Sequence, residues 1–325
     1  MGPARRHRDA RERAHGLALT PPIDDRGPAG STVVHLVDGT YELYRQHYGT
    51  PAKDGERPPY AATAGALAST LRLVADGATH VAVATDHVIE SFRNDLWPGY
   101  KTSEGMEPEL LEQIPILEEA LRAMGVAVFA MEREEADDGL AAAAAGAAAD
   151  ASVTQVRILT PDKDLGQCIA GRRVIQVDRR TGTEVDEAAL RERLGIGPSS
   201  VPDYLALVGD ASDGFPGLRG WGERSASAVL GRYATLEAIP EDPARWTADG
   251  VAVRGAARLA ATLRDGMADA LLFRTLATLR TDLPVGSVAD WRWWGPQARF
   301  RAVAADLGSP ALAERAERLA SDGGG

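Results

Sequence analysis

Acidic side chains stand where short apolar, β-branched runs of this sequence end. Four such runs are each followed within a few residues by one to three carboxylates. These are Asp38, Asp86, Glu135, Asp137, Asp138, Asp162 and Asp164. A single acidic residue at such a place is commonly a helix cap or a turn residue, but capping does not explain why all four runs share the pattern. The spacing therefore indicates a site whose chemistry depends on carboxylates.

The apolar runs alternate with longer segments of helical period, which predicts βαβ units. The expected strands are 32–37, 80–84, 126–131, 156–159 and 174–177, and the expected helices include 60–75, 108–124 and 136–149. We therefore expect an α/β fold with a mostly parallel central sheet flanked by helices. Because ligands of open parallel sheets bind beyond the carboxyl ends of the strands, the seven carboxylates are expected to meet at one edge.

Carboxylates a few ångströms apart raise one another's pKa values and destabilise the fold unless a cation lies among them. We see no cluster of Lys or Arg at the predicted strand ends. The sequence therefore predicts bound divalent metal, and all-oxygen ligation favours Mg²⁺ or Mn²⁺ over zinc.

A glycine-rich stretch follows the predicted sheet. Its first part, Gly209-Asp210-Ala-Ser-Asp213-Gly214, adds two carboxylates, although Asp, Ser and Gly are also typical of a surface turn. Its second part has the pattern of a helix-hairpin-helix, with Gly217, Gly220 and Gly222 in the hairpin. Such a hairpin presents backbone N–H groups to phosphates without reading bases, so this module is expected to bind duplex DNA.

Composition limits the function classes. The net charge is −11, and the nine candidate carboxylates supply −9 of it, which leaves −2 for the rest; two divalent ions would add +4. The acidic balance therefore does not exclude a nucleic-acid partner. The single cysteine, Cys168, excludes an internal disulfide, and we find no Cys/His cluster with zinc spacing. We also find no membrane-spanning run and no secretory signal. A cytoplasmic protein with no membrane partner is therefore expected.

The ordered motifs resemble those of the 5′ nuclease and flap endonuclease family, which includes the 5′ nuclease domain of bacterial DNA polymerase I. The matching segments, within roughly 31–283, are Leu36-Val-Asp38, Thr85-Asp86 with Phe92-Arg93, Tyr100-Lys101, Glu135-Ala-Asp137-Asp138, Thr160-Pro-Asp162-Lys-Asp164 and 203–213. The resemblance implies a resolvase/PIN-like nuclease fold with a C-terminal helix-hairpin-helix (helix-3-turn-helix) module. It also implies two bound metals, an arch that guides a single-stranded 5′ end, and often K⁺ at the hairpin.

The resemblance assigns roles to the residues. One metal would lie nearest Asp86, Glu135, Asp137 and Asp162. The other would be held by Asp164, Asp210 and Asp213. Asp38 would stand beside them, and Asp138 also belongs to the expected ligand set. Arg93 and Lys101 would clamp the scissile phosphate, and Tyr100 would stack on an unpaired base. Gly217, Gly220, Gly222 and Arg224 would contact the duplex. The chain departs from the family pattern at Glu104, where Arg is common.

We therefore expect a metal-dependent 5′-3′ exonuclease or structure-specific flap endonuclease that hydrolyses DNA by a two-metal mechanism in replication or repair. The expected partners are DNA with 5′ ends, flaps or nicks, and also RNA primers, and the chain is expected to be a monomer. The expected domains are a flexible basic tail (1–30), the nuclease domain (31–200), the hairpin module (201–285) and a C-terminal extension (286–325).

Three alternatives compete with this interpretation. A noncatalytic duplex-binding protein would use the hairpin alone, and a PIN-type ribonuclease would share the sheet. A haloacid-dehalogenase-type phosphatase is suggested by Asp38-Gly-Thr40 but needs a nucleophilic Asp two residues earlier, where this chain has Leu36.

Overall fold

The computed structural model describes residues 32–49 and 58–322, so the expected basic tail (1–30) lies outside the described residues. A six-stranded sheet in the order β3-β2-β1-β4-β5-β6 forms its centre. The strands are β1 (Thr32–Asp38), β2 (His80–Asp86), β3 (Ala127–Met131), β4 (Val153–Leu159), β5 (Val174–Asp178) and β6 (Thr183–Val185). β1 to β5 run parallel and β6 pairs antiparallel with β5, which confirms the predicted mostly parallel sheet.

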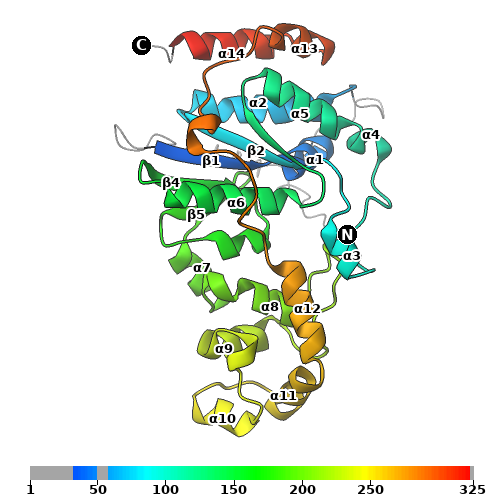
Figure 1. The fold of residues 1–325 in the computed structure, drawn as a ribbon, viewed down its shortest axis with the longest axis vertical. Helices are drawn as coiled ribbons and strands as arrows, with labels where there is room; N and C mark the ends of the chain where they lie inside the picture. Colours follow the sequence, from blue (N-terminus) through cyan, green and yellow to red (C-terminus); the bar gives the residue numbers. More distant parts are fainter. Residues whose placement is uncertain (1–31, 50–57, 323–325) are drawn as a thin grey trace, which may run out of the picture.

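Helices cover both faces of the sheet (Figure 1). The helices α1 (Gly39–Gly49), α2 (Ala61–Ala75) and α5 (Gln113–Ala123) lie on one face, and the alanine-rich α6 (Ala136–Ala149) lies on the other. The period of two in β1 serves both layers, because Val37 packs with the α2 and α5 layer while Val34 and Leu36 pack against α6. Small side chains let α6 lie close to β1 and β4.

The C-terminal helices α13 (Phe300–Asp306) and α14 (Ala311–Asp322) form a further layer over α5 and α2 (Figure 1). They are anchored by Phe300, Ala304, Ala313 and Ala316, which are all buried in the same core as α2 and α5. The part of the predicted C-terminal extension that is described therefore packs on the sheet layers.

The remaining helices form a separate module below the sheet, with its own apolar core (Figure 1). They are α7 (Glu187–Leu194), α8 (Val201–Val208), α9 (Glu223–Tyr233), α10 (Pro243–Ala248), α11 (Ala256–Asp265) and α12 (Met267–Ala277). After α12 the chain returns to the sheet, where Trp293 N–H donates to Thr79 O at 2.8 Å. Short elements complete the described fold, namely α3 (Phe92–Leu96), α4 (Pro108–Leu111) and the 3₁₀ turns η1 (Lys163–Cys168), η2 (Pro198–Ser200), η3 (Leu236–Ala238) and η4 (Val288–Trp291).

The loop between α8 and α9 requires glycine. Gly217 has φ +65°, and a Cβ there would lie 2.3 Å from Gly209 N, so the loop closes tightly on itself. This closure brings residues 210–213 to the carboxyl edge of the sheet. None of the described helices is both long enough and apolar enough to cross a membrane.

Candidate active site

Asp38 and Asp86 lie at the carboxyl ends of neighbouring parallel strands. Asp38 accepts hydrogen bonds from Tyr41 N–H and Thr160 Oγ1, both at 2.9 Å, which ties β1 to the end of β4. Asp86 Oδ1 accepts from Ala136 N–H at 2.8 Å, which ties β2 to the first turn of α6. These two carboxylates, which the sequence pattern indicated, therefore connect the ends of β1 and β2 to neighbouring elements through hydrogen bonds.

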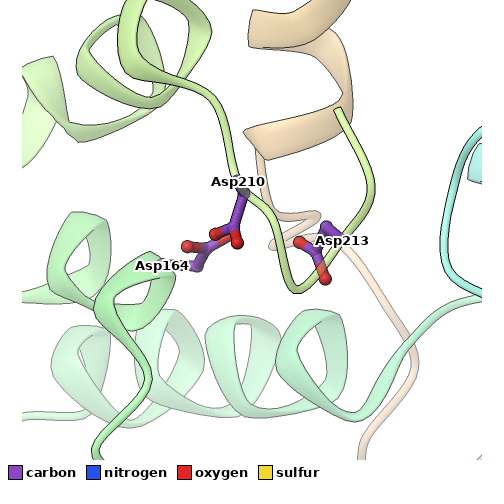
Figure 2. Close-up of side chains that lie close together, drawn as sticks. All are labelled: Asp164, Asp210 and Asp213. Atoms are coloured by element: carbon purple, nitrogen blue, oxygen red, sulfur yellow. The ribbon is translucent and has the colours of Figure 1, made fainter. Parts of the chain in front are cut away.

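Three further carboxylates, Asp164, Asp210 and Asp213, form what we call the acidic cluster (Figure 2). One oxygen from each of the three carboxylates lies within 4.8 Å of the other two. Asp164 comes from η1 after β4, and the other two come from the loop after α8, so both parts of the molecule contribute. Asp164 Oδ1 is buried and has no hydrogen-bond partner within the described residues. An unpartnered carboxylate oxygen beside two other carboxylates fits a divalent cation that prefers oxygen ligands.

Electrostatics at this edge indicate missing positive charge. Burial, with the charges of Asp86 and Asp162 added, raises the pKa of Asp38 to about 7. Burial and neighbouring carboxylates also raise the pKa values of Asp137 and Asp164 well above the usual range. Protonation or cation binding would relieve these groups, and a bound divalent cation would favour their ionised forms.

The expectation that no cluster of Lys or Arg neutralises the strand-end carboxylates was wrong. The Lys101 ammonium lies 2.6 Å from Glu135 Oε2 and 3.0 Å from Asp213 Oδ1, and the Lys163 ammonium lies 2.9 Å from Asp210 Oδ2. Arg93 is buried against Glu135. Each of these cations is distant in sequence from the carboxylate it meets, so spacing alone did not reveal the pairs.

Asp138 and Arg93 form a buried, two-pronged ion pair. The guanidinium Nη1 and Nη2 donate to the two Asp138 oxygens at 2.7 and 2.8 Å, and Nη1 also reaches Glu135 Oε1 at 3.0 Å. Arg93 Nε donates to Leu276 O at the end of α12. With Arg93 1% exposed and Asp138 fully buried, these contacts favour a structural role for both and do not support the expected metal ligation by Asp138 or phosphate clamping by Arg93.

Glu135 is held in the same group. Burial opposes its ionisation, but Lys101 and Arg93 outweigh that effect and lower its pKa. We call Glu135 and Asp138 the cation-paired carboxylates. Tyr100 is 3% exposed and its hydroxyl donates to Glu135 Oε2 at 3.3 Å, so this buried ring is placed to support Glu135 and not to stack on a base.

Among the predicted duplex-binding residues, Gly220, Gly222 and Arg224 are exposed at the start of α9. Gly222 N–H donates to Ser225 Oγ at 3.0 Å, so Ser225 caps this helix. Gly217 differs, because its close approach to Gly209 gives it a role in folding the loop.

Sequence reasoning missed Lys163. The available signal was its position between Asp162 and Asp164 in a chain with only three lysines. It also missed Tyr44, whose half-buried phenol lies close enough to Asp86 and Lys101 for their charges to act on it; burial, with Tyr48 and Asp86, raises its pKa to about 12.

Comparison with known proteins agrees with this geometry. A family model described as the 5′-3′ exonuclease N-terminal resolvase-like domain matches residues 33–195, and the 5′-3′ exonuclease C-terminal SAM fold matches residues 196–299. DNA polymerase I of Pseudomonas aeruginosa is 33% identical over 281 residues, which cover 83% of this chain and 29% of the relative. The thermostable DNA polymerase I of Thermus aquaticus is 34% identical over 260 residues, which cover 78% of this chain and 29% of the relative.

Solved structures share the fold at low identity. T5 5′-exonuclease with bound divalent zinc ions has a TM-score of 0.59 at 18% identity, covering 89% of this chain and 98% of the other. Flap endonuclease-1 from Methanococcus jannaschii has a TM-score of 0.57 at 13% identity, covering 90% and 93%.

The sheet topology and its acidic edge define a resolvase-like nuclease. The chain belongs to the 5′-3′ exonuclease family, which confirms both the predicted fold class and the nuclease interpretation. It spans about three tenths of the length of the DNA polymerase I relatives.

Proposed function

We propose that this protein is a metal-dependent 5′-3′ exonuclease and structure-specific flap endonuclease that hydrolyses DNA phosphodiester bonds in replication or repair. The observation that carries the proposal is the acidic cluster, in which buried Asp164 Oδ1 has no partner within the described residues and two other carboxylates lie within 4.8 Å. A cluster of this kind is costly to the fold unless a cation binds there.

We assign the ligand sets by leaving out the carboxylate whose two oxygens are both bound by a buried cation. One Mg²⁺ or Mn²⁺ would be held by the acidic cluster, and a second by Asp38, Asp86, Asp137 and Asp162 with Glu135 beside them. Asp138 drops out of the expected set because Arg93 binds both of its oxygens. When bound, such a metal pair supplies an activated water and stabilises charge on the attacking and leaving oxygens. K⁺ at the hairpin belongs to the proposal as well.

Lys101 is the protein group placed to act on the scissile phosphate. Its side chain is 30% exposed, and the pKa of its ammonium is raised well above the usual range because Glu135 and Asp213 outweigh the effect of burial. It therefore remains charged near neutral pH and can stabilise negative charge that develops on a phosphate at this edge. Arg93 and Tyr100 act behind it by holding Glu135 in place.

DNA with 5′ ends, flaps or nicks is the proposed substrate. The exposed hairpin at the start of α9 supports duplex binding, and two of the structural neighbours are the catalytic core of Rad2 and a T5 flap endonuclease, both in complex with DNA. Cleavage of RNA primers, a monomeric state and a cytoplasmic location complete the proposal. The findings do not favour a noncatalytic DNA-binding protein or a PIN-type ribonuclease.

End-labelled flap, nicked, blunt and single-stranded DNA, incubated with Mg²⁺ or Mn²⁺, test the proposal through product length. We expect cleavage that chelator abolishes and that Asp162→Asn loses while it still binds the substrate. Asp76→Asn is the matched control and should cleave normally, because Asp76 ends α2 shortly before the start of β2, away from the carboxyl ends of the strands. Full cleavage in excess chelator would exclude the two-metal mechanism.

A further inference from the structure

Lys163 is an unusual residue in this chain. The sequence contains three lysines and 33 arginines, and two of the lysines, Lys101 and Lys163, lie at the acidic edge. Lysine differs from arginine in carrying a compact charge on a flexible stem, which can exchange one anionic partner for another without a fixed two-pronged geometry. The choice of lysine at these positions therefore suggests a cation that changes partners.

The present partner of Lys163 is a carboxylate that the metal would also need. The ammonium lies 2.9 Å from Asp210 Oδ2, while Asp210 Oδ1 accepts from Ser212 N–H at 2.9 Å. Both oxygens are thus engaged. A divalent ion held by the acidic cluster competes with Lys163 for Asp210, and the Lys163 side chain is 47% exposed, so it has room to move.

Lys163 also lies on the path from the acidic edge to the hairpin. It lines a groove of about 360 Å³ together with Arg193, Gly209 and Gly222. A second hollow of about 690 Å³ adjoins this groove through Arg193 and is lined by Arg224 and Arg232. The groove and the hollow connect the acidic edge with the start of α9 along a surface that carries Lys163 and three arginines beside Glu223 and Asp249.

We propose that Lys163 is a shared cation, which neutralises Asp210 in the metal-free protein and binds a backbone phosphate of the DNA once metal occupies the acidic cluster. This inference rests on the proposed function. It assigns two roles to Lys163, which are DNA binding and competition with the metal for Asp210. Removing the charge should therefore weaken DNA binding and tighten metal binding.

The first measurement is the salt dependence of binding to a nicked duplex, followed by fluorescence anisotropy with Ca²⁺ and with a check that the DNA stays intact. Lys163→Met should lose one phosphate contact, which makes the slope of log affinity against log salt shallower by about 0.9. The ratio of the DNA affinity of the unmodified protein to that of Lys163→Met should then fall about threefold to fourfold between 50 and 200 mM salt. Lys163→Arg should keep the original slope.

Arg72→Met is the matched control, because Arg72 makes an exposed ion pair with Asp76 at the opposite edge of the sheet. Its slope should equal that of the unmodified protein. An unchanged slope for Lys163→Met would overturn the inference and leave the proposed function intact. Failure of the unmodified protein to bind the nicked duplex would instead overturn the proposed function.

The second measurement is Mg²⁺ binding without DNA, by isothermal titration calorimetry. Lys163→Met should bind Mg²⁺ more tightly, because a competing ammonium is removed from Asp210. Weaker Mg²⁺ binding by Lys163→Met would show that Lys163 only holds Asp210 in position, and would overturn the shared role.

Discussion

The two sides of the acidic edge neutralise their carboxylates in different ways. The cation-paired carboxylates, Glu135 and Asp138, share Arg93, which is 1% exposed and also bound to the backbone at the end of α12. In the acidic cluster, Asp164 has an unpartnered oxygen, and the other two carboxylates meet the partly exposed ammonium groups of Lys101 and Lys163. A buried cation makes a carboxylate part of the fold, whereas an exposed or missing cation leaves it able to bind metal.

Arg93→Met tests the first half of this comparison and should have the largest effect. It leaves Asp138 buried without its cation and removes one of the two cations at Glu135, which we expect to lower the free energy of unfolding by about 3–5 kcal/mol. Urea denaturation of the metal-free protein measures this loss. Arg133→Met is the control, because Arg133 and Asp95 form an exposed pair at 3.8 Å, and it should change stability by less than about 0.5 kcal/mol. A small loss for Arg93→Met would mean that the ion pair is not structural.

The pH dependence of stability tests the second half. The pKa of Asp38 is raised to about 7 in the folded protein, from an ordinary value of 3.8. Since the folded state holds this proton more tightly, the resulting stability is fully present below pH 3.8 and is lost as the pH rises through 7. On the order of 4 kcal/mol should therefore disappear across that range in the metal-free protein.

Glu135 should contribute with the opposite sign, because its pKa is lowered and its stabilisation is lost as the pH falls. Thermal unfolding is measured against pH for the protein with chelator, for the protein with Mg²⁺ and for Asp38→Asn with chelator. The comparison separates the contribution of Asp38 from that of Glu135. Both Mg²⁺ and Asp38→Asn should flatten the decline toward pH 7. An equally steep decline for Asp38→Asn would assign it to other groups.

Lys101 is intermediate between the two sides, because it contacts both Glu135 and Asp213. Lys101→Met should slow single-turnover cleavage of every substrate by about a hundredfold, since a charge that stabilises the phosphate acts on the reaction itself. Its loss of stability should be smaller than that of Arg93→Met, because the Lys101 side chain is 30% exposed. A rate that is unchanged on all substrates would restrict Lys101 to neutralising carboxylates.

The sequence predicted much of the sheet and the convergence of its carboxylates, because strand ends in a parallel sheet share one edge wherever the helices lie. The expected strand 32–37 is observed as Thr32–Asp38, and 126–131 as Ala127–Met131. The edge strand β6 was missed because it is only three residues long and two of its residues are exposed.

The sequence did not predict which carboxylates are neutralised. Arg93 meets Asp138 across 45 residues. Hydrogen bonds from the start of α3 to the segment before α6, namely Phe92 N–H to Arg133 O and Ser91 Oγ to Glu135, bring the two together, and no local period predicts them. The sequence pattern therefore predicts the acidic residues as a group, whereas their division into members with and without a buried cation needed the fold. Lys163 was within reach of sequence reasoning, since it stands between two of the aspartates.

Glu104 extends the comparison to a carboxylate outside the site. Glu104 is exposed, and its own N–H donates to Thr102 Oγ1 at 3.3 Å. It belongs neither to the cation-paired carboxylates nor to the acidic cluster. If the single-stranded 5′ end passes this segment, Glu104 repels it by an amount that salt screens, on the order of 1 kcal/mol. We therefore expect Glu104→Arg to tighten binding of long 5′ flaps at low salt, by about tenfold at most, and to leave nicked and blunt duplexes nearly unchanged. Salt titrations of affinity on flap and nicked substrates measure both effects, with Glu104→Gln as the neutral control that should fall between. A flap affinity and salt slope that are the same in all three proteins would show that Glu104 faces away from the strand.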